Sequence, residues 1–243
     1  MVKTLPRHAE NENEKMVPAP TTAWLQHGSA GPIFHGQHRT AEHPDSRYAG
    51  DRYFYGGGNY LPNGMTPFNF NTGNYFVNIT FLSFLELSYR CTLQKAKRYD
   101  GKEGYFHQDR SMTARVRPLK EGKFHPSLLL GVDDPFKNTG INYFATVYGA
   151  LTKGFSIAKG DRLALTAGYY FPLNDHSIKD GPFGGISYSP AFCREMTVMA
   201  EYDSEGFNVG AAARLWRHLS IHVFTREFNS ISGGIRYECR LLH

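Results

Sequence analysis

The stretch that decides the fold is ISGGIRYECRLL, Ile231 to Leu242, near the end of the chain. The series that begins at Ile231 and takes every second residue is apolar or small, and the intervening series holds Arg236, Glu238 and Arg240. Strict alternation of this kind predicts a β-strand whose two faces lie in different surroundings. The class of protein therefore depends on which environment receives the row of ions.

The same alternation recurs along most of the chain. It is clear in FLELSYRCTLQ (84–94), SMTARVRP (111–118), MTVMAEY (196–202) and GFNVGAAARLW (206–216). There are about twelve such runs, and no segment has a convincing helical period. They lie near 53–60, 74–82, 85–94, 109–118, 126–133, 141–153, 161–171, 181–190, 195–203, 206–215, 218–225 and 229–241. Residues 51–243 are therefore predicted to form one all-β domain.

The connections between these runs alternate in length over much of the chain. LPNGMTPFNFNTG (61–73) and KAKRYDGKEGYFHQ (95–108) are long and rich in turn formers, whereas LSF (82–84) is very short. An antiparallel up-and-down barrel with long loops at one rim and short turns at the other has this arrangement. The sequence thus predicts an up-and-down β-barrel of about twelve strands.

Two architectures satisfy the alternation, and periodicity alone does not separate them. In a soluble barrel or sandwich that binds a glycan or an apolar ligand, the apolar row is the core and the ions face water. In a transmembrane barrel the apolar row meets lipid and the ions line a hydrated lumen. The small apolar residues, the aromatic residues near strand ends and the runs of about ten residues are typical of the transmembrane class.

Composition fits a β-rich domain and argues against several function classes. Aromatic residues make up 14% of the 243 residues, and the formal net charge of +5 comes without the dense Lys/Arg clusters of a nucleic-acid-binding protein. The three cysteines lie far apart with no CxxC pair, so neither a disulfide framework nor a zinc site is expected. No run approaches the ~20 apolar residues of a transmembrane helix.

Residues 1–50 differ from the rest of the chain. They hold five of the eleven histidines and lack sustained periodicity, so they are predicted to form an irregular or disordered arm. His35, His38 and His43 can bind a transition metal, but such binding in a histidine-rich arm is usually adventitious, and no metal site is predicted. The first residues contain no continuous apolar stretch, so no secretory signal peptide is expected.

Acidic side chains supply the other candidate chemistry. Glu86, Glu201 and Glu238 can in principle form an acid–base pair, yet carboxylates that face a polar lumen more often pair with arginines. Acidic residues near predicted strand ends can coordinate calcium, but they lack the spacing of a dedicated site, and solvated loop charges are favoured. These residues are Asp133, Asp134, Glu201, Asp203 and Glu205. Without any nucleotide or nucleophile motif, the sequence predicts no catalytic centre and no cofactor.

The ion row is the remaining candidate for function. If it faces inward, arginines outnumber glutamates in the lumen, and an excess of positive charge favours anions. The alternative is a closed network of ion pairs that stiffens a small barrel without passing anything. The residues expected to line the lumen are Arg90, Arg115, Arg117, Arg214, Arg226, Arg236, Arg240, Glu86, Glu201 and Glu238.

Four stretches resemble the YjbH-type exopolysaccharide-associated outer-membrane proteins, in particular the short single-barrel form of Bacteroides-like bacteria. They are NYFVNITFLSFLELSYRCTL, DRSMTARVRPLKEGKFHPSLLLGVDDPF, INYFATVYGALTKGF and VMAEYDSEGFNVGAAARLWRHLSIHVFTREFNSISGGIRYE. The resemblance extends from about Gly56 to Tyr237 and rests on strand order and on the RPLKEG, GVDDPF and AEYDSEG connections. None of these pieces is a catalytic signature.

The resemblance implies a bacterial outer-membrane β-barrel linked to capsule or exopolysaccharide production, without established catalytic residues. Outer-membrane lipid, an anionic polysaccharide and envelope export proteins are the partners it implies, and no nucleic acid is expected. Residues 1–50 depart from the family pattern, which begins with a signal peptide and a glycine-proline-rich strand.

Overall fold

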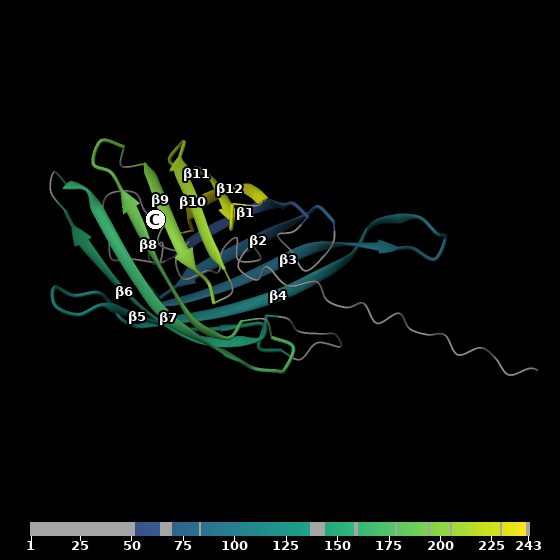
Figure 1. Cartoon of the computed structure of the whole chain (residues 1–243), viewed down its shortest axis with the longest axis horizontal. Coiled ribbons are helices and arrows are strands. Elements are labelled where there is room, and N and C mark those ends of the chain that lie inside the picture. The colour runs from purple at the N-terminus through teal and green to yellow at the C-terminus, as the bar shows by residue number, and fades with distance from the viewer. Residues whose placement is uncertain are drawn as a thin grey trace, which may run out of the picture.

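The computed structural model describes residues 52–63, 70–82, 84–136, 144–157, 160–177, 179–193, 195–204, 206–228 and 230–241. Their strands close into an antiparallel barrel in which each strand pairs with its neighbours in the chain and β12 returns to β1 (Figure 1). The strands are β1 (Tyr53–Leu61), β2 (Thr72–Phe81), β3 (Leu85–Lys97), β4 (Glu103–Leu119), β5 (Ser127–Asp133), β6 (Thr146–Ser156), β7 (Arg162–Pro172), β8 (Gly181–Ser189), β9 (Met196–Tyr202), β10 (Phe207–Arg214), β11 (Leu219–Arg226) and β12 (Ser230–Arg240). The predicted all-β, twelve-stranded, up-and-down barrel is confirmed.

The two rims of the barrel carry different connections. The start of β1 and the end of β12 lie at one rim, the turn end, with connections 82–84, 120–126, 157–161, 190–195 and 215–218. The opposite rim, the loop end, carries 62–71, 98–102, 134–145, 173–180, 203–206 and 227–229. The predicted alternation of long loops with short turns is clearest around the two longest loops, 62–71 and 134–145.

Strand register shows how the sheet closes. Tyr53 at the start of β1 pairs with Thr80, which pairs with Glu86 of β3. Followed further round the barrel, the same hydrogen-bonded row reaches Arg115 of β4 and then Tyr170 near the end of β7. The row therefore climbs from the turn end toward the loop end, which is the stagger that tilted strands need to form a closed barrel.

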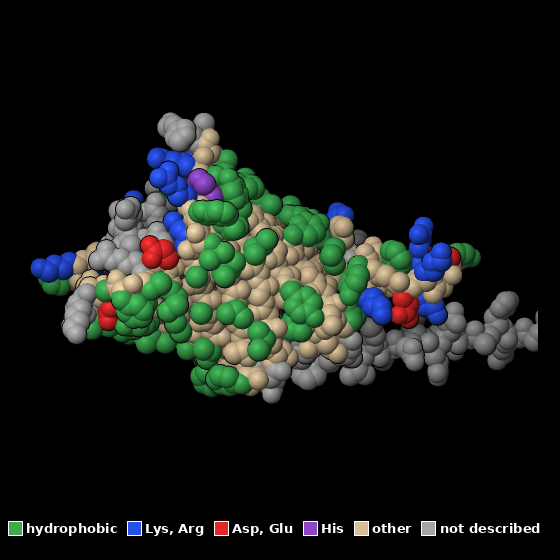
Figure 2. Space-filling view, turned by 90° about the horizontal axis from the view of Figure 1, so that it is seen from above, with side chains coloured by type: hydrophobic (Ala, Val, Ile, Leu, Met, Phe, Trp, Pro, Cys, Tyr) green, Lys and Arg blue, Asp and Glu red, His purple; other side chains and the backbone are tan. Residues whose placement is uncertain are grey.

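Alternation along each strand separates a polar interior from an apolar wall. Asn78, Glu86 and Thr92 are completely buried, whereas Ile79 and Leu87 beside them are 40% and 50% exposed. Other exposed outward residues are Tyr75, Met112, Val116, Leu130, Val147, Leu151, Leu165, Ile186, Val198, Ile221, Val223 and Ile235. On the face that Figure 2 shows, hydrophobic side chains are spread over the wall and charged side chains lie toward its two ends. The ions are inside, and the apolar row faces outward.

An aromatic cluster fills the interior on the side of β5 to β8. Its rings are Tyr148, Tyr170 and Phe183, with 5.6 Å between the Tyr148 and Tyr170 centroids in an edge-on arrangement. Gly131 and Gly168 leave room for these rings, because a Cβ atom would lie 2.3 Å from the Tyr148 ring and 2.2 Å from the Phe183 ring. Any larger residue at either glycine would displace the rings.

One predicted boundary is wrong, because residues 95–108 do not form a long loop. β3 continues to Lys97 and β4 begins at Glu103, so the two strands form a long hairpin that extends beyond its neighbours (Figure 1). The register shifts between Gln94 and Ala96, which marks a β-bulge.

The predicted arm, residues 1–50, lies outside the described residues. No helix in the described part of the chain is long and apolar enough to cross a membrane.

Candidate functional site

Glu86 lies at the centre of a buried polar cluster contributed by the first four strands. The Tyr55 hydroxyl donates a hydrogen bond of 2.8 Å to its Oε2, and the Asn78 amide donates one of 3.4 Å to its Oε1. Arg115 Nη1 lies 3.8 Å from Oε1, and no more than 1% of any of these four side chains is exposed. The cluster forms because Glu86 and Arg115 are direct cross-strand partners on the inward face.

A second ion cluster surrounds Glu238 at the turn end of the barrel. Arg214 of β10 and Arg236 of β12 both pair with its carboxylate, with Arg236 Nη2 at 3.6 Å from Oε2. Further along, His222 Nε2 shares a hydrogen bond of 2.6 Å with Asn59 Oδ1. Arginines from β10 and β12 therefore pair with one buried glutamate.

The loop end contains a lysine that enters the barrel from a connection. Lys179 follows β7 and precedes β8, yet only 1% of it is exposed. Its Nζ lies 3.4 Å from the Tyr170 hydroxyl oxygen and 4.6 Å from the centroid of that ring. Burial lowers the pKa of Lys179 to about 8, while the charges of Asp133 and Asp203 oppose that change.

The acidic residues near these strand ends are not solvated loop charges, so that expectation is wrong. Asp133, Asp134, Glu201 and Asp203 are all buried. Lys179, from the 173–180 connection, lies close enough to Asp133, Glu201 and Asp203 for their charges to act on its ammonium group. Among the described residues, no group of three or more His, Cys, Asp or Glu side chains is arranged to hold a metal ion. Glu205, His35, His38 and His43 lie outside the described residues.

Phe144 closes the interior near the same rim. It lies in the connection between β5 and β6, is almost fully buried, and has the Arg90 guanidinium 5.0 Å from its ring centroid. A cation over an aromatic face is favourable, the more so when both groups are desolvated. Two loop residues, Phe144 and Lys179, thus occupy the barrel interior at the loop end.

Most residues predicted to line the lumen do lie inside the barrel. Arg214 is half-buried, whereas Arg240 is exposed at the end of β12 and belongs to the rim. Arg226 is the last residue of β11, at the loop end, where its backbone pairs with Ser230. The buried members are Arg90, Arg115, Arg117, Arg236, Glu86, Glu201 and Glu238.

Sequence reasoning missed several interior residues. Tyr55 and Asn78 belong to the series of every second residue that points inward along their strands. Alternation was therefore enough to place both in the interior. No periodicity marks Lys179, because it lies in a connection. Phe144 precedes β6 but lies within the predicted run 141–153 and shares the parity of the buried Thr146 and Tyr148, so alternation marked it as well. His222 lies on the inward face of β11 and carries the same signal as Tyr55.

Exposure of the inward residues shows where water reaches the interior. Tyr55, Asn78 and Glu86 have no accessible surface, so their own side chains fill this part of the barrel. Ser187 and Thr197, toward the turn ends of β8 and β9, are half-buried. Water therefore enters from the turn end on the side of β8 to β10.

Titration of Asp134 provides a pH test of the loop-end cluster. Burial raises its pKa to about 6, with Arg90 opposing the rise and Asp109 and Asp133 adding to it. A carboxyl group with a raised folded-state pKa takes up a proton on folding, so the contribution to stability grows as the pH falls from about 6 to about 4. We expect the wild type to gain stability relative to Asp134→Asn over this interval in urea titrations. An unchanging difference between the two proteins would contradict the burial of this carboxyl group.

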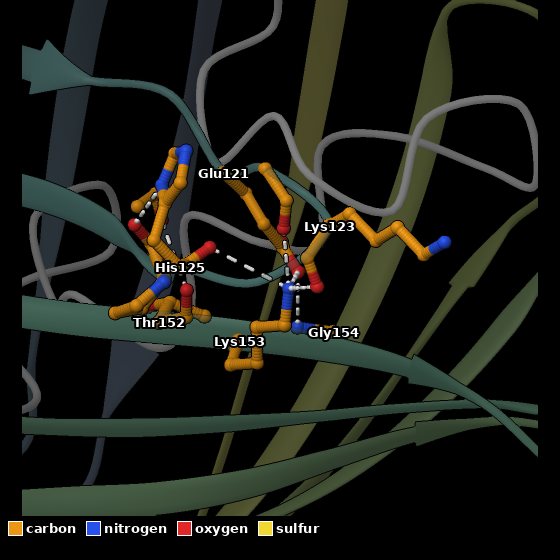
Figure 3. A network of polar contacts seen from close by, with 9 residues as sticks. Glu121, Lys123, His125, Thr152, Lys153 and Gly154 are labelled. Atoms are coloured by element: carbon orange, nitrogen blue, oxygen red, sulfur yellow. Dashed lines mark hydrogen bonds and ion pairs between the residues drawn. The ribbon is translucent and has the colours of Figure 1, made fainter.

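A clamp at the turn end fixes the 120–126 connection to β6 (Figure 3). Lys153 Nζ donates to the carbonyl oxygens of Gly122 at 2.5 Å and Lys123 at 3.1 Å, and it lies 3.3 Å from Glu121 Oε1. The other side of the clamp is the Gly154 amide, which donates to Glu121 Oε1 at 2.8 Å. The clamp therefore holds β6 to the chain just before β5 begins, beyond the last β5–β6 pair, Ser127 with Thr152.

Replacing Lys153 with methionine is expected to lower the free energy of unfolding by about 1–2 kcal/mol, because several charge-assisted hydrogen bonds are lost at a partly exposed site. Amide exchange at Gly154 should accelerate, which mass spectrometry can measure. Lys123→Met is the control, because the Lys123 side chain is exposed in the same connection. Equal exchange rates of the Gly154 amide in the two variants would show that the hydrogen bonds of Lys153 do not protect this segment in solution.

Comparisons with known proteins give little at the level of sequence. No protein-family model matches the chain, and no curated protein matches it. One solved structure with a similar arrangement is the COG4313 outer membrane channel from Pseudomonas putida F1, with a TM-score of 0.41 and 10% sequence identity. The match covers 77% of this chain and 95% of that one.

Proposed function

We propose that this chain is a non-catalytic β-barrel of the bacterial outer membrane. The observation that carries the proposal is the apolar wall around a charged interior. Soluble monomers rarely expose a contiguous apolar patch larger than about 600 Å². Here outward residues such as Leu87, Leu151 and Ile235 are each about half exposed or more, and similar residues occur on strand after strand. This distribution argues against the soluble glycan-binding barrel, whose apolar row would be its core.

Aromatic residues at both rims support the same proposal. Phe84, Phe124, Phe192 and Trp216 are exposed at the turn end. At the loop end the exposed aromatic residues are Tyr60, Tyr169, Phe171, Tyr202, Phe207 and Phe228. Aromatic side chains at the two ends of an apolar wall are typical of the interfacial girdles of outer-membrane barrels.

The interior favours a scaffold over an open conduit. Glu86 and Arg115 are sealed from water, and Phe144 and Lys179 enter at the loop end. A pore that passes solutes needs a continuous hydrated path, whereas this arrangement fills the barrel with paired ions and rings. We propose that the resting barrel is closed.

The proposed biological role is assistance in export or surface assembly of an exopolysaccharide or capsule. Its support is the resemblance of four sequence stretches to the YjbH-type family. The partners would be outer-membrane lipid, an anionic polysaccharide and envelope export proteins. Deleting the gene in the source bacterium should reduce surface-bound polysaccharide, and the wild-type gene should restore it. Unchanged polysaccharide after deletion would refute this role without affecting the membrane proposal.

Gel migration tests the membrane proposal directly. Protein folded in detergent should migrate faster before boiling than after it, because membrane barrels remain folded in SDS. In planar bilayers the wild type should show no steady conductance, as the closed interior predicts. Identical migration of unboiled and boiled samples, with full recovery of the protein in a detergent-free aqueous phase, would support the soluble barrel instead.

A further inference from the structure

The β3–β4 hairpin extends beyond every other strand of the described barrel. β2 pairs with β3 only up to Thr92, and β5 pairs with β4 only from Thr113. Beyond those points the ladder continues between β3 and β4 alone, out to Lys97 paired with Glu103. The hairpin therefore stands outside the apolar wall at the loop end (Figure 1).

The tip of this hairpin has a defined shape. The Arg98 amide donates to the Lys102 carbonyl at 2.7 Å, and the Gly101 amide donates to the Arg98 carbonyl at 2.9 Å. Gly101 has a φ of 82°, a conformation that glycine adopts at little cost. The Asp100 carboxylate accepts a bond of 3.1 Å from the Lys102 amide. A tip with these bonds is ordered before it meets a partner, which lowers the entropy cost of binding.

The base of the hairpin is fixed as well. The Tyr105 hydroxyl donates to the Asn71 carbonyl oxygen at 2.5 Å, and its ring lies edge-on to Phe70 with 6.1 Å between centroids. Lys95 Nζ lies 3.0 Å from Glu103 Oε2 across the ladder. Contacts to the β1–β2 loop therefore hold the hairpin against the barrel.

Basic and aromatic side chains gather at the tip. The Arg98 guanidinium carbon lies 5.7 Å from the centroid of the Phe106 ring, which is half exposed. Tyr99 is fully exposed, and Lys97 and Lys102 are exposed beside it. Figure 2 shows Lys and Arg side chains at this end of the molecule as well as at the opposite end. Two carboxylates of the hairpin are already engaged, Asp100 by a backbone amide and Glu103 by Lys95.

We propose that the tip of the β3–β4 hairpin is a docking surface for an acidic polysaccharide. Arg98 and Lys102 would pair with sugar carboxylates, and Tyr99 and Phe106 would offer flat apolar faces to sugar rings. A headgroup phosphate of the membrane fits less well, because the tip projects beyond the wall that lipid would cover. The inference rests on the proposed function, because the loop end faces the exterior in an outer-membrane barrel.

The test uses the full chain in lipid nanodiscs and three soluble probes. The probes are alginate as a polyuronate, dextran as a neutral polysaccharide, and single-stranded DNA as a polyanion without sugar carboxylates. The tip variant carries Arg98→Gln, Tyr99→Ser and Lys102→Gln. The control variant carries Lys123→Gln and Phe124→Ser, which removes an exposed cation and aromatic ring of similar geometry, 5.2 Å apart, at the turn end.

Alginate should bind the wild type and the control equally and the tip variant at least about tenfold more weakly, with binding that weakens as salt rises. Dextran and DNA should bind much more weakly than alginate. Equal alginate affinity in the tip variant, or no alginate binding by the wild type, would overturn the docking surface. DNA binding as tight as alginate binding would assign the tip to polyanions in general and also overturn it. Insertion into nanodiscs reports separately on the membrane proposal.

Discussion

Replacing Arg115 with methionine is expected to lower the free energy of unfolding by about 3–5 kcal/mol, because removing one partner strands a buried charge. Arg115 and Glu86 are 1% and 0% exposed, so water cannot replace the lost guanidinium without disrupting the wall. The change can be measured by guanidinium titration of protein folded in detergent micelles, followed by far-UV circular dichroism.

The double variant Glu86→Gln with Arg115→Met is the matched control. Glutamine retains an acceptor for the Tyr55 hydroxyl, which lies 2.8 Å from the Glu86 carboxylate, but carries no charge. We expect the double variant to recover much of the lost stability, as the non-additivity of coupled residues requires. The loss of stability in the single variant Glu86→Gln is measured as well. If the losses of the two single variants add up to the loss of the double variant, Glu86 and Arg115 do not act as a pair, and the closed network does not stabilise the interior.

Replacing Ile186 with arginine is expected to cost about 2–4 kcal/mol of folding free energy in lipid vesicles, because the side chain points outward near mid-height of the wall. Ile186 pairs with Leu165 of β7 and Ala200 of β9 and is 40% exposed. Folding yield and urea midpoints in vesicles measure the effect.

The neighbouring change Ser187→Arg is the matched comparison. Ser187 points inward, is half-buried, and lies on the side that water reaches. Arginine there can extend toward the turn end, so the loss should be clearly smaller than for Ile186→Arg. Equal losses of folding free energy at positions 186 and 187 would mean that the outward face does not meet lipid while the inward face meets a hydrated lumen.

Alternation and the lengths of the connections were enough to predict the barrel and the number of strands, and alternation placed most of the ions that prove to be buried on one face. Each strand carries its own register signal, because neighbouring positions point to opposite faces. Glu86 and Arg115 could therefore be assigned to one face before their pairing was known. Which face points inward did not follow from periodicity, since a core and a lipid-facing wall are both apolar.

The features that the sequence did not reveal depend on connections. The segment 95–108 has the turn formers and charges of a loop, yet both of its arms pair with each other as strands. Lys179 enters the barrel because of the path of its loop, and it has no neighbour pattern that would mark a buried site. Tertiary context overrides local composition at these positions.

Fluorescence quenching by lipids with brominated acyl chains tests the central claim most directly. Ile186→Trp and Ser187→Trp would each be made in a background in which the two native tryptophans, Trp24 and Trp216, are replaced by phenylalanine. An apolar wall embedded in lipid predicts strong quenching at position 186 and weak quenching at position 187. Weak quenching at both positions, in protein shown to be folded by circular dichroism, would contradict a barrel that spans the membrane.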